Sequence, residues 1–206
     1  MFFSFAKIMM PNDNAKIFPM SALVGVVLVS TAAAAPPAAT SRYVKFDLKK
    51  CPVIERQEEG AVTVWHCKDA GGFEFFVAED DLRFSIGYGP GGRDQRSFHQ
   101  SLAPFNTIND TLELRQRAGA NAPHASILRY YTEGAIDNET GRLRERGEIL
   151  VVTKIDGAKA CHLAYVDAVA NPDANRLAQE AADSGDGFDC EKDEAAKVGK
   201  TGKSPM

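Results

Sequence analysis

Residues 149–166 read ILVVTKIDGAKACHLAYV, and this stretch decides the fold class that the sequence predicts. The near-continuous apolar run at 149–155 predicts a central β-strand, because a strand buried on both faces does not need polar residues at alternate positions. Asp156-Gly157 is typical of a tight hairpin turn, and a second strand is expected at 161–166. The stretch therefore predicts an antiparallel hairpin at the centre of a sheet.

After this hairpin the apolar spacing changes from that of a strand to that of a helix. Asn171 can cap a helix in which Pro172 takes the first position. Small and apolar residues then recur at intervals of three and four, namely Ala174, Leu177, Ala178, Ala181 and Ala182. Such a stripe permits close packing on a sheet, so we expect an amphipathic helix that ends at Gly185 or Gly187.

Alternation of apolar and polar residues predicts more strands upstream of the hairpin. The expected strands lie at 62–67, 73–78, 82–88, 111–115 and 127–131. Ser97 could cap a short helix among them, and residues 133–147, rich in Gly and charge, are expected to form a solvated loop. No internal repeat is evident.

These elements predict an α+β fold with a single β-rich domain at 42–190. Its antiparallel sheet would pack against the C-terminal amphipathic helix, because each element must bury its apolar face. Residues 191–206 are charged and rich in Gly and Lys, and we expect them to form a disordered tail.

The N-terminal segment has the three parts of an export signal. Two lysines precede an uncharged run at 17–39, and Ala32 and Ala34 match the small residues of an A-x-A cleavage site. We therefore expect a signal peptide at 1–34 and a flexible lead-in at 35–41. The alternative is an uncleaved membrane anchor, since the run is long enough to cross a bilayer of about 30 Å. Prolines and small residues within the run favour cleavage.

Export changes the interpretation of the four cysteines. In an oxidising compartment an even number implies disulfides, and four cysteines allow three connectivities. Sequence proximity favours Cys51–Cys67 and Cys161–Cys190, and the second bridge would staple the helix to the strand before it. Zinc binding and thiol catalysis are the alternatives, but neither C-x-x-C nor paired ligand spacing is present.

The composition and the motifs argue against most chemistries. With 24 Lys+Arg against 28 Asp+Glu, a net charge of -4 argues against nucleic-acid binding. No G-x-S-x-G elbow or H-E-x-x-H motif occurs. Ser85 lies in the middle of a predicted strand, where a position on the polar face explains it without a catalytic role. We expect no catalytic residue and no cofactor.

The histidines and the acidic runs also have simpler explanations than a site. His66 and His162 could form a pair across the sheet, but the favoured explanation is two half-exposed strand histidines. The run at 183–189 lacks oxygen ligands where a calcium loop needs them, and 87–92 lacks the lysine and helix of a phosphate loop. We therefore expect no metal site.

Three residues are candidates for binding a partner. Tyr88, Arg129 and Tyr131 belong to residue types that dominate protein interfaces. Tyr88 lies beside a glycine-rich turn and is expected to be the most exposed of them. Core packing is the simpler assignment for Trp65 and Tyr130.

Several stretches together resemble a family of small exported bacterial proteins without an assigned activity. The stretches are 105–115, 127–130, 150–154, 161–167, 174–178 and 188–190. The resemblance implies export, supports the Cys161–Cys190 pair and implies nothing about a substrate.

Together these features predict a periplasmic or secreted, non-enzymatic module that binds a protein or a component of the cell envelope. No nucleic-acid partner is expected, and membrane contact would occur only through an uncleaved signal segment. The alternative function is a periplasmic hydrolase whose acid–base pair is assembled by the fold, for example from Glu79, Asp81 and a histidine.

Overall fold

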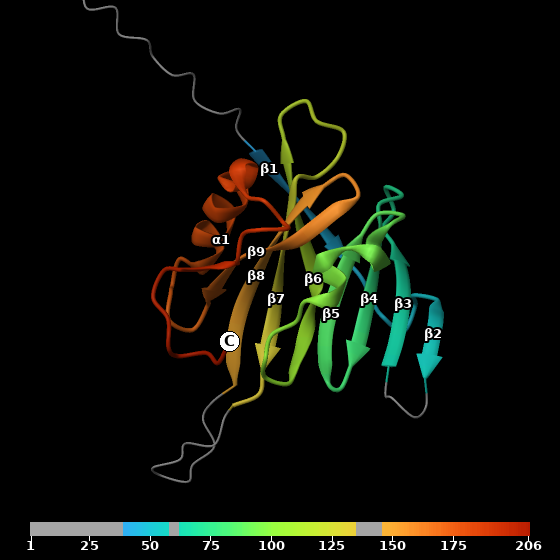
Figure 1. Ribbon diagram of the computed structural model, residues 1–206, viewed down its shortest axis with the longest axis horizontal. Coiled ribbons are helices and arrows are strands. Elements are labelled where there is room, and N and C mark those ends of the chain that lie inside the picture. Colours follow the sequence, from blue (N-terminus) through green and yellow to red (C-terminus); the bar gives the residue numbers. More distant parts are fainter. Residues whose placement is uncertain (1–38, 58–61, 135–145) are drawn as a thin grey trace, which may run out of the picture. The chain divides into compact units, whose positions relative to one another are not determined.

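The computed structural model describes residues 39–57, 62–134 and 146–206 (Figure 1). The predicted signal peptide and most of the predicted loop at 133–147 lie outside these residues. The described part contains ten strands, one α-helix and three short 3₁₀ turns. It is therefore β-rich and belongs broadly to the α+β class.

The larger sheet has six strands in the order β1-β6-β7-β8-β9-β10. Its strands are β1 (Ala39–Lys45), β6 (Asn106–Arg117), β7 (Ala125–Thr132), β8 (Gly147–Asp156), β9 (Lys159–Asp167) and β10 (Ala196–Val198). All neighbours are antiparallel except β9 and β10. The predicted hairpin is confirmed, since β8 and β9 pair across Asp156-Gly157 and Gly157 has a φ of +59°.

The smaller sheet has four antiparallel strands in sequence order. They are β2 (Val53–Gln57), β3 (Val62–Lys68), β4 (Glu74–Asp80) and β5 (Arg83–Tyr88). The expectation of one sheet was therefore wrong. The chain leaves β5 through two 3₁₀ turns, η1 (Gly92–Asp94) and η2 (Arg96–His99), and β6 then pairs with β1 and β7 instead of β5.

The two sheets share the main apolar core, because each has one apolar face that must be buried. This core contains Phe75, Val77, Ile86, Leu112, Leu114, Leu128, Tyr130, Ile149 and Val151. On the other face of the larger sheet, Leu150 and Val152 of β8 pack with the helix α1 (Ala174–Asp183). Figure 1 shows α1 beside β8 and β9. Burial on both faces accounts for the unbroken apolar sequence of β8.

A helix, α1, occurs in the expected region, but it begins later than predicted. Its N-cap is Asp173, and Asn171 makes no cap. The side-chain amide of Asn171 instead donates to the carbonyl oxygens of Asp167 and Lys200, and its Oδ1 accepts the N–H of Lys200. Asn171 therefore joins the approach to α1 to the segment after β10.

Two segments expected to lack structure are ordered. Residues 39–41 of the expected lead-in form the start of β1 and pair with β6, because a backbone ladder does not require apolar side chains. Part of the expected disordered tail forms β10 along the edge of β9. Ser204 is buried against Asp167. Hydrogen bonds to buried acceptors order this charged segment.

The disulfides are Cys51–Cys67 and Cys161–Cys190, the expected pairing. The second joins β9 to a residue beyond both α1 and the 3₁₀ turn η3 (Gly185–Gly187). It therefore holds the segment after the helix, and the expectation that it staples the helix itself is not confirmed. Two disulfides are typical of proteins outside the reducing cytoplasm. Among the described helices, none combines the length and the apolar character needed to cross a bilayer.

Candidate binding surface

Tyr88 does not belong to a binding surface. It is only 2% exposed, and its ring lies in the core shared by the two sheets. Ser126 Oγ donates a hydrogen bond of 2.7 Å to its phenol oxygen, and burial raises the pKa of Tyr88 to about 12. The expectation of an exposed Tyr88 was wrong. The alternation of residues in β5 does not indicate which face of that strand the larger sheet covers. Tyr130 is buried, as expected.

Arg129 and Tyr131 lie on the face of β7 that carries α1, since they alternate with the core residues Leu128 and Tyr130. The guanidinium of Arg129 donates to Glu148 at 2.6 Å and to Asn175, in the first turn of α1, at 3.4 Å. Tyr131 is half-buried and lies two residues further along β7. Both residues therefore lie where the helix ceases to cover the sheet.

Tyr43 of β1 lies on the same face and was not identified from the sequence. It is 61% exposed and pairs with Glu113 of β6 across the ladder. The spacing of Val44 and Phe46, two residues apart, could have identified Tyr43, because it predicts a strand whose other face includes Tyr43.

A shallow hollow of 140 Å³ connects Tyr43 with Arg129. The register between β6 and β7 shifts between Ile108 and Leu112, so Asn109 and Thr111 have no partner in the regular ladder with β7. Both residues line the hollow. We call the surface formed by Tyr43, Asn109, Thr111, Arg129 and Tyr131 the β1–β7 face; Tyr43 is exposed, and the other four residues are half-buried.

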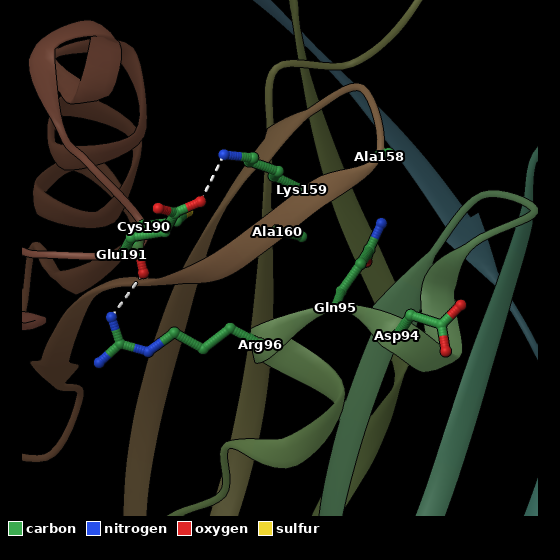
Figure 2. A pocket seen from close by; sticks show the side chains of 8 residues that line it. All are labelled: Asp94, Gln95, Arg96, Ala158, Lys159, Ala160, Cys190 and Glu191. Carbon is green, nitrogen blue, oxygen red and sulfur yellow. Dashed lines mark hydrogen bonds and ion pairs between the residues drawn. The ribbon is translucent and has the colours of Figure 1, made fainter.

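A second cavity, of 410 Å³, lies between η1 and the β8–β9 hairpin (Figure 2). Its two basic side chains have partners within the protein. Arg96 donates to the carbonyl oxygen of Cys190 at 2.6 Å, and Lys159 Nζ lies 2.6 Å from a carboxylate oxygen of Glu191. The side-chain amide of Gln95 forms hydrogen bonds with both backbone groups of Tyr88. These contacts hold the tail and the β5–β6 connection in place.

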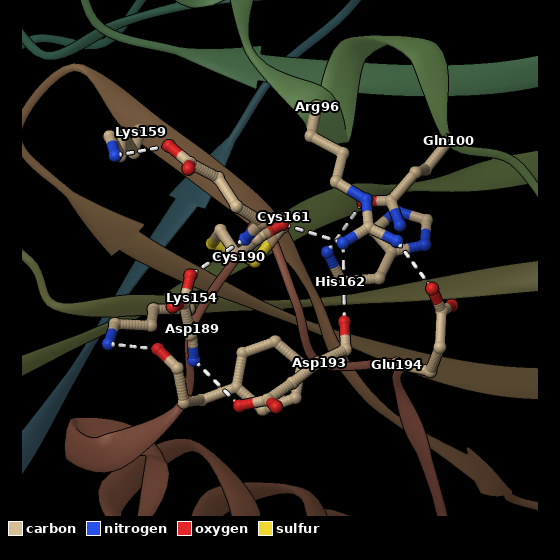
Figure 3. The surroundings of a disulfide bond; sticks show 12 residues. Arg96, Gln100, Lys154, Lys159, Cys161, His162, Asp189, Cys190, Asp193 and Glu194 are labelled. Carbon is tan, nitrogen blue, oxygen red and sulfur yellow. Dashed lines mark hydrogen bonds and ion pairs between the residues drawn. A yellow bond between two sulfur atoms is a disulfide. The ribbon is translucent and has the colours of Figure 1, made fainter.

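His162 is buried beside the Cys161–Cys190 bridge (Figure 3). Its Nδ1 lies 2.9 Å from the phenol oxygen of Tyr165, and burial, with a smaller contribution from Arg96, lowers its pKa to about 4. His66 is in the other sheet, where it stacks on Phe76. The two histidines therefore do not form a pair.

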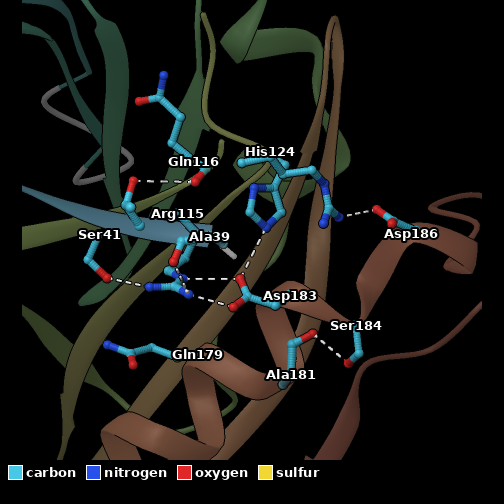
Figure 4. Close-up of polar contacts among 12 residues, drawn as sticks. Ala39, Ser41, Arg115, Gln116, His124, Gln179, Ala181, Asp183, Ser184 and Asp186 are labelled. Carbon is cyan, nitrogen blue, oxygen red and sulfur yellow. Dashed lines mark hydrogen bonds and ion pairs between the residues drawn. The ribbon is translucent and has the colours of Figure 1, made fainter. Parts of the chain in front are cut away.

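Asp183, part of the acidic run that resembles a calcium loop, takes part in a polar cluster (Figure 4). Arg115 is 7% exposed and donates to both carboxylate oxygens of Asp183, at 3.1 and 2.5 Å, and to Ser41 Oγ at 2.5 Å. His124 Nε2 lies 3.3 Å from Asp183, and burial, followed by the charge of Arg117, lowers the pKa of His124. The cluster joins α1 to β6 and β1.

No metal site accompanies these acidic residues in the described part of the chain, since nowhere in it do three or more His, Cys, Asp or Glu side chains gather to hold an ion.

Part of the proposed acid–base pair does share a pocket. Asp81 and His99 line a 460 Å³ hollow on the outer face of the smaller sheet, together with Ser85. However, Asp81 pairs with Arg83 at 2.6 Å, and Ser85 Oγ donates to the carbonyl oxygen of Phe98. In the residues that the structure describes, no hydrogen bond joins His99 to Asp81 or Ser85.

Glu79 does not line this pocket. Asp81 and His99 therefore line one hollow, but no hydrogen bond among the described residues joins them into a proton relay.

Comparisons with protein-family models, curated proteins and solved structures found no match.

Proposed function

We propose that this protein is an exported binding module that holds another protein on the β1–β7 face. The observation that carries the proposal is the exposure of Tyr43, at 61%, beside the hollow that also includes Arg129. Tyrosine and arginine dominate the binding energy of protein interfaces, since both bury a large area and also form hydrogen bonds.

The shape of the surface favours a protein over a small substrate. Its hollow of 140 Å³ is well below the roughly 300–1,000 Å³ of small-molecule sites. The contact side chains stand on paired strands, and Arg129 is held by Glu148 and Asn175. A surface ordered before binding loses less conformational entropy when a partner docks.

Export is the second part of the proposal. The two disulfides support an oxidising environment, and the predicted signal peptide at 1–34 would direct the chain to the periplasm or outside the cell. N-terminal sequencing of the protein from culture fractions tests this part. A start at or near Ala35 is expected, and a retained Met1 would favour a membrane anchor.

Site-specific crosslinking tests the binding face. Benzoylphenylalanine replaces Tyr43 in one exported variant and Leu82, which is 54% exposed on the β4–β5 turn, in a control. Irradiation of cells should crosslink one discrete protein through position 43 but not through position 82. Arg129→Ala should weaken that crosslink. Equal products from both positions, or none from position 43, would contradict the proposal.

A hydrolase is the second candidate, because Asp81 and His99 line one pocket. Esters, amides and glycosides offered to the wild-type protein and to His99→Ala test this function. Hydrolysis that disappears in His99→Ala, together with a negative crosslinking result, would favour the enzyme.

A further inference from the structure

A cavity of 460 Å³ opens at the edge of the main core, between the end of β1 and the end of β3. Its volume is within the range of about 300–1,000 Å³ typical of sites for small ligands. Val44, which lines it, belongs to the main core on the opposite face of β1 from Tyr43.

The floor of this cavity is apolar and continues the core. Val44 is 4% exposed, and the Cys51–Cys67 bridge crosses from the β1–β2 connection to β3. Phe46 and Cys51 are partly buried against the same core, and Phe46 packs edge-on to Phe75 with ring centroids 5.2 Å apart. An apolar group placed here would cover core atoms that water now reaches.

The rim of the cavity is basic. Lys45 ends β1, Lys50 lies in the following turn, Lys68 ends β3, and all three are exposed. Lys50 Nζ is 3.9 Å from Asp47, beyond hydrogen-bond distance, and Lys45 and Lys68 form no ion pair with any described residue. We call this cavity the lysine pocket.

Local backbone bonds hold the rim in place. The N–H of Lys50 donates to the carbonyl oxygen of Asp47, and the N–H of Lys49 donates to the Asp47 carboxylate. Cys51, next along the chain, is tied covalently to β3. The turn that carries Lys50 is thus fixed over an apolar floor before any ligand arrives.

The chain has a net charge of -4, yet three of the residues that line this cavity are lysines, and Asp47 is the one lining residue with a carboxylate. His66 also lines the cavity, and its ring lies 2.8 Å from the carboxylate of Glu74. Lysine side chains can lay their methylene stems along an apolar surface while their ammonium groups stay in water. We propose that the lysine pocket binds a fatty-acid anion. Its carboxylate lies among Lys45, Lys50 and Lys68, and its acyl chain covers Val44 and the Cys51–Cys67 bridge.

The test is a titration of the oxidised protein with octanoate, followed by amide chemical shifts in NMR. Acetate supplies the charge without the chain, and octanol supplies the chain without the charge. Saturable shifts around Cys51 and Cys67 are expected with octanoate, and binding at least about tenfold weaker with either of the other two compounds. Equal affinity for octanoate and octanol, or shifts centred elsewhere, would overturn the proposal.

Charge variants provide the second arm. The triple variant Lys45→Gln, Lys50→Gln, Lys68→Gln should weaken octanoate binding about tenfold and leave octanol binding unchanged.

The matched control is Lys159→Gln, Lys192→Gln, Lys197→Gln, which removes the same charge from other surfaces and should bind octanoate like the wild type. All these side chains are exposed, so folding should survive in both variants. Equal octanoate affinity in the two variants would overturn the role of the rim.

Discussion

Ser204 Oγ donates a 2.7 Å hydrogen bond to Oδ1 of Asp167, joining the segment after β10 to the end of β9. The backbone N–H groups of Lys203 and Ser204 donate to Oδ2, each at 2.8 Å, and those of Val169 and Ala170 donate to Oδ1 at 3.1 Å. Burial by itself raises the pKa of Asp167, but the hydrogen bonds from Ser204 and the neighbouring backbone outweigh it and leave the pKa below 3.8.

Replacing this carboxylate should destabilise the fold. Asp167→Asn places an amide against N–H donors, so the free energy of unfolding in urea at pH 7 should fall by about 3 kcal/mol. Asp94→Asn, at an exposed position, is the control and should change it by less than about 0.5 kcal/mol. Because the native pKa is lowered, the contribution is present above pH 3.8 and is lost at lower pH, where the two proteins should converge.

His162 should make stability depend on pH in a higher range. Its pKa is about 4 in the native protein against 6.5 for an ordinary histidine, so between these values the unfolded chain binds more protons. The free energy of unfolding should therefore fall as the pH is lowered from 6.5 to 4, by about 3 kcal/mol from this residue. Urea titrations of the wild type and His162→Asn measure it; the same pH dependence in both proteins would contradict the prediction.

The Cys161–Cys190 bridge should stabilise the protein chiefly by restricting the unfolded chain. With a sequence separation of 29, its removal in Cys161→Ala, Cys190→Ala should cost about 3.5 kcal/mol. Hydrogen exchange should also accelerate in β10 more than in β7, because the bridge holds the segment that leads to β10. Cys51→Ala, Cys67→Ala is the comparison, and there the exchange of β10 should change no more than that of β7.

Gly87 should be intolerant of any side chain. A Cβ at this position would lie 1.9 Å from the carbonyl oxygen of Gly92, where η1 packs on β5. Gly87→Ala is expected to lower the free energy of unfolding by about 3 kcal/mol, since backbone must move. A Cβ on Gly91 meets no atom within 4 Å, so Gly91→Ala should remain within about 0.5 kcal/mol of the wild type. Similar losses in both variants would contradict this packing.

Features that depend on neighbours in the sequence could be predicted. Asp156-Gly157 requires only a local turn, and the β8–β9 hairpin followed from it. The helical spacing of Ala174, Ala178 and Ala182 depends only on the 3.6-residue period, so α1 was also expected. The start of the helix could not be predicted, because the side chain of Asn171 does not cap the helix. It donates instead to the carbonyl oxygens of Asp167 and of the distant Lys200.

The candidate surface could be predicted only in part. The choice of Arg129 and Tyr131 depended on residue type, and β7 does place both on the partly open face. Tyr88 is of a residue type equally suited to an interface, but it lies in the core, because the larger sheet covers its face of β5. Tyr43 joins the surface only through the pairing of β1 with β6, a contact between residues about 70 positions apart.

By itself, the sequence determined the strand and helix periods, the central hairpin and the pairing of nearby cysteines, because each depends on local geometry or short loop closure. Only the tertiary structure decided that there are two sheets, that Tyr88 is buried and that the charged segment after Cys190 is ordered. The physical reason is that burial and hydrogen-bond satisfaction depend on which distant segment covers a face. From composition, Ser204 was expected to lie in a solvated tail. In the structure, its N–H and its Oγ both donate hydrogen bonds to the buried carboxylate of Asp167.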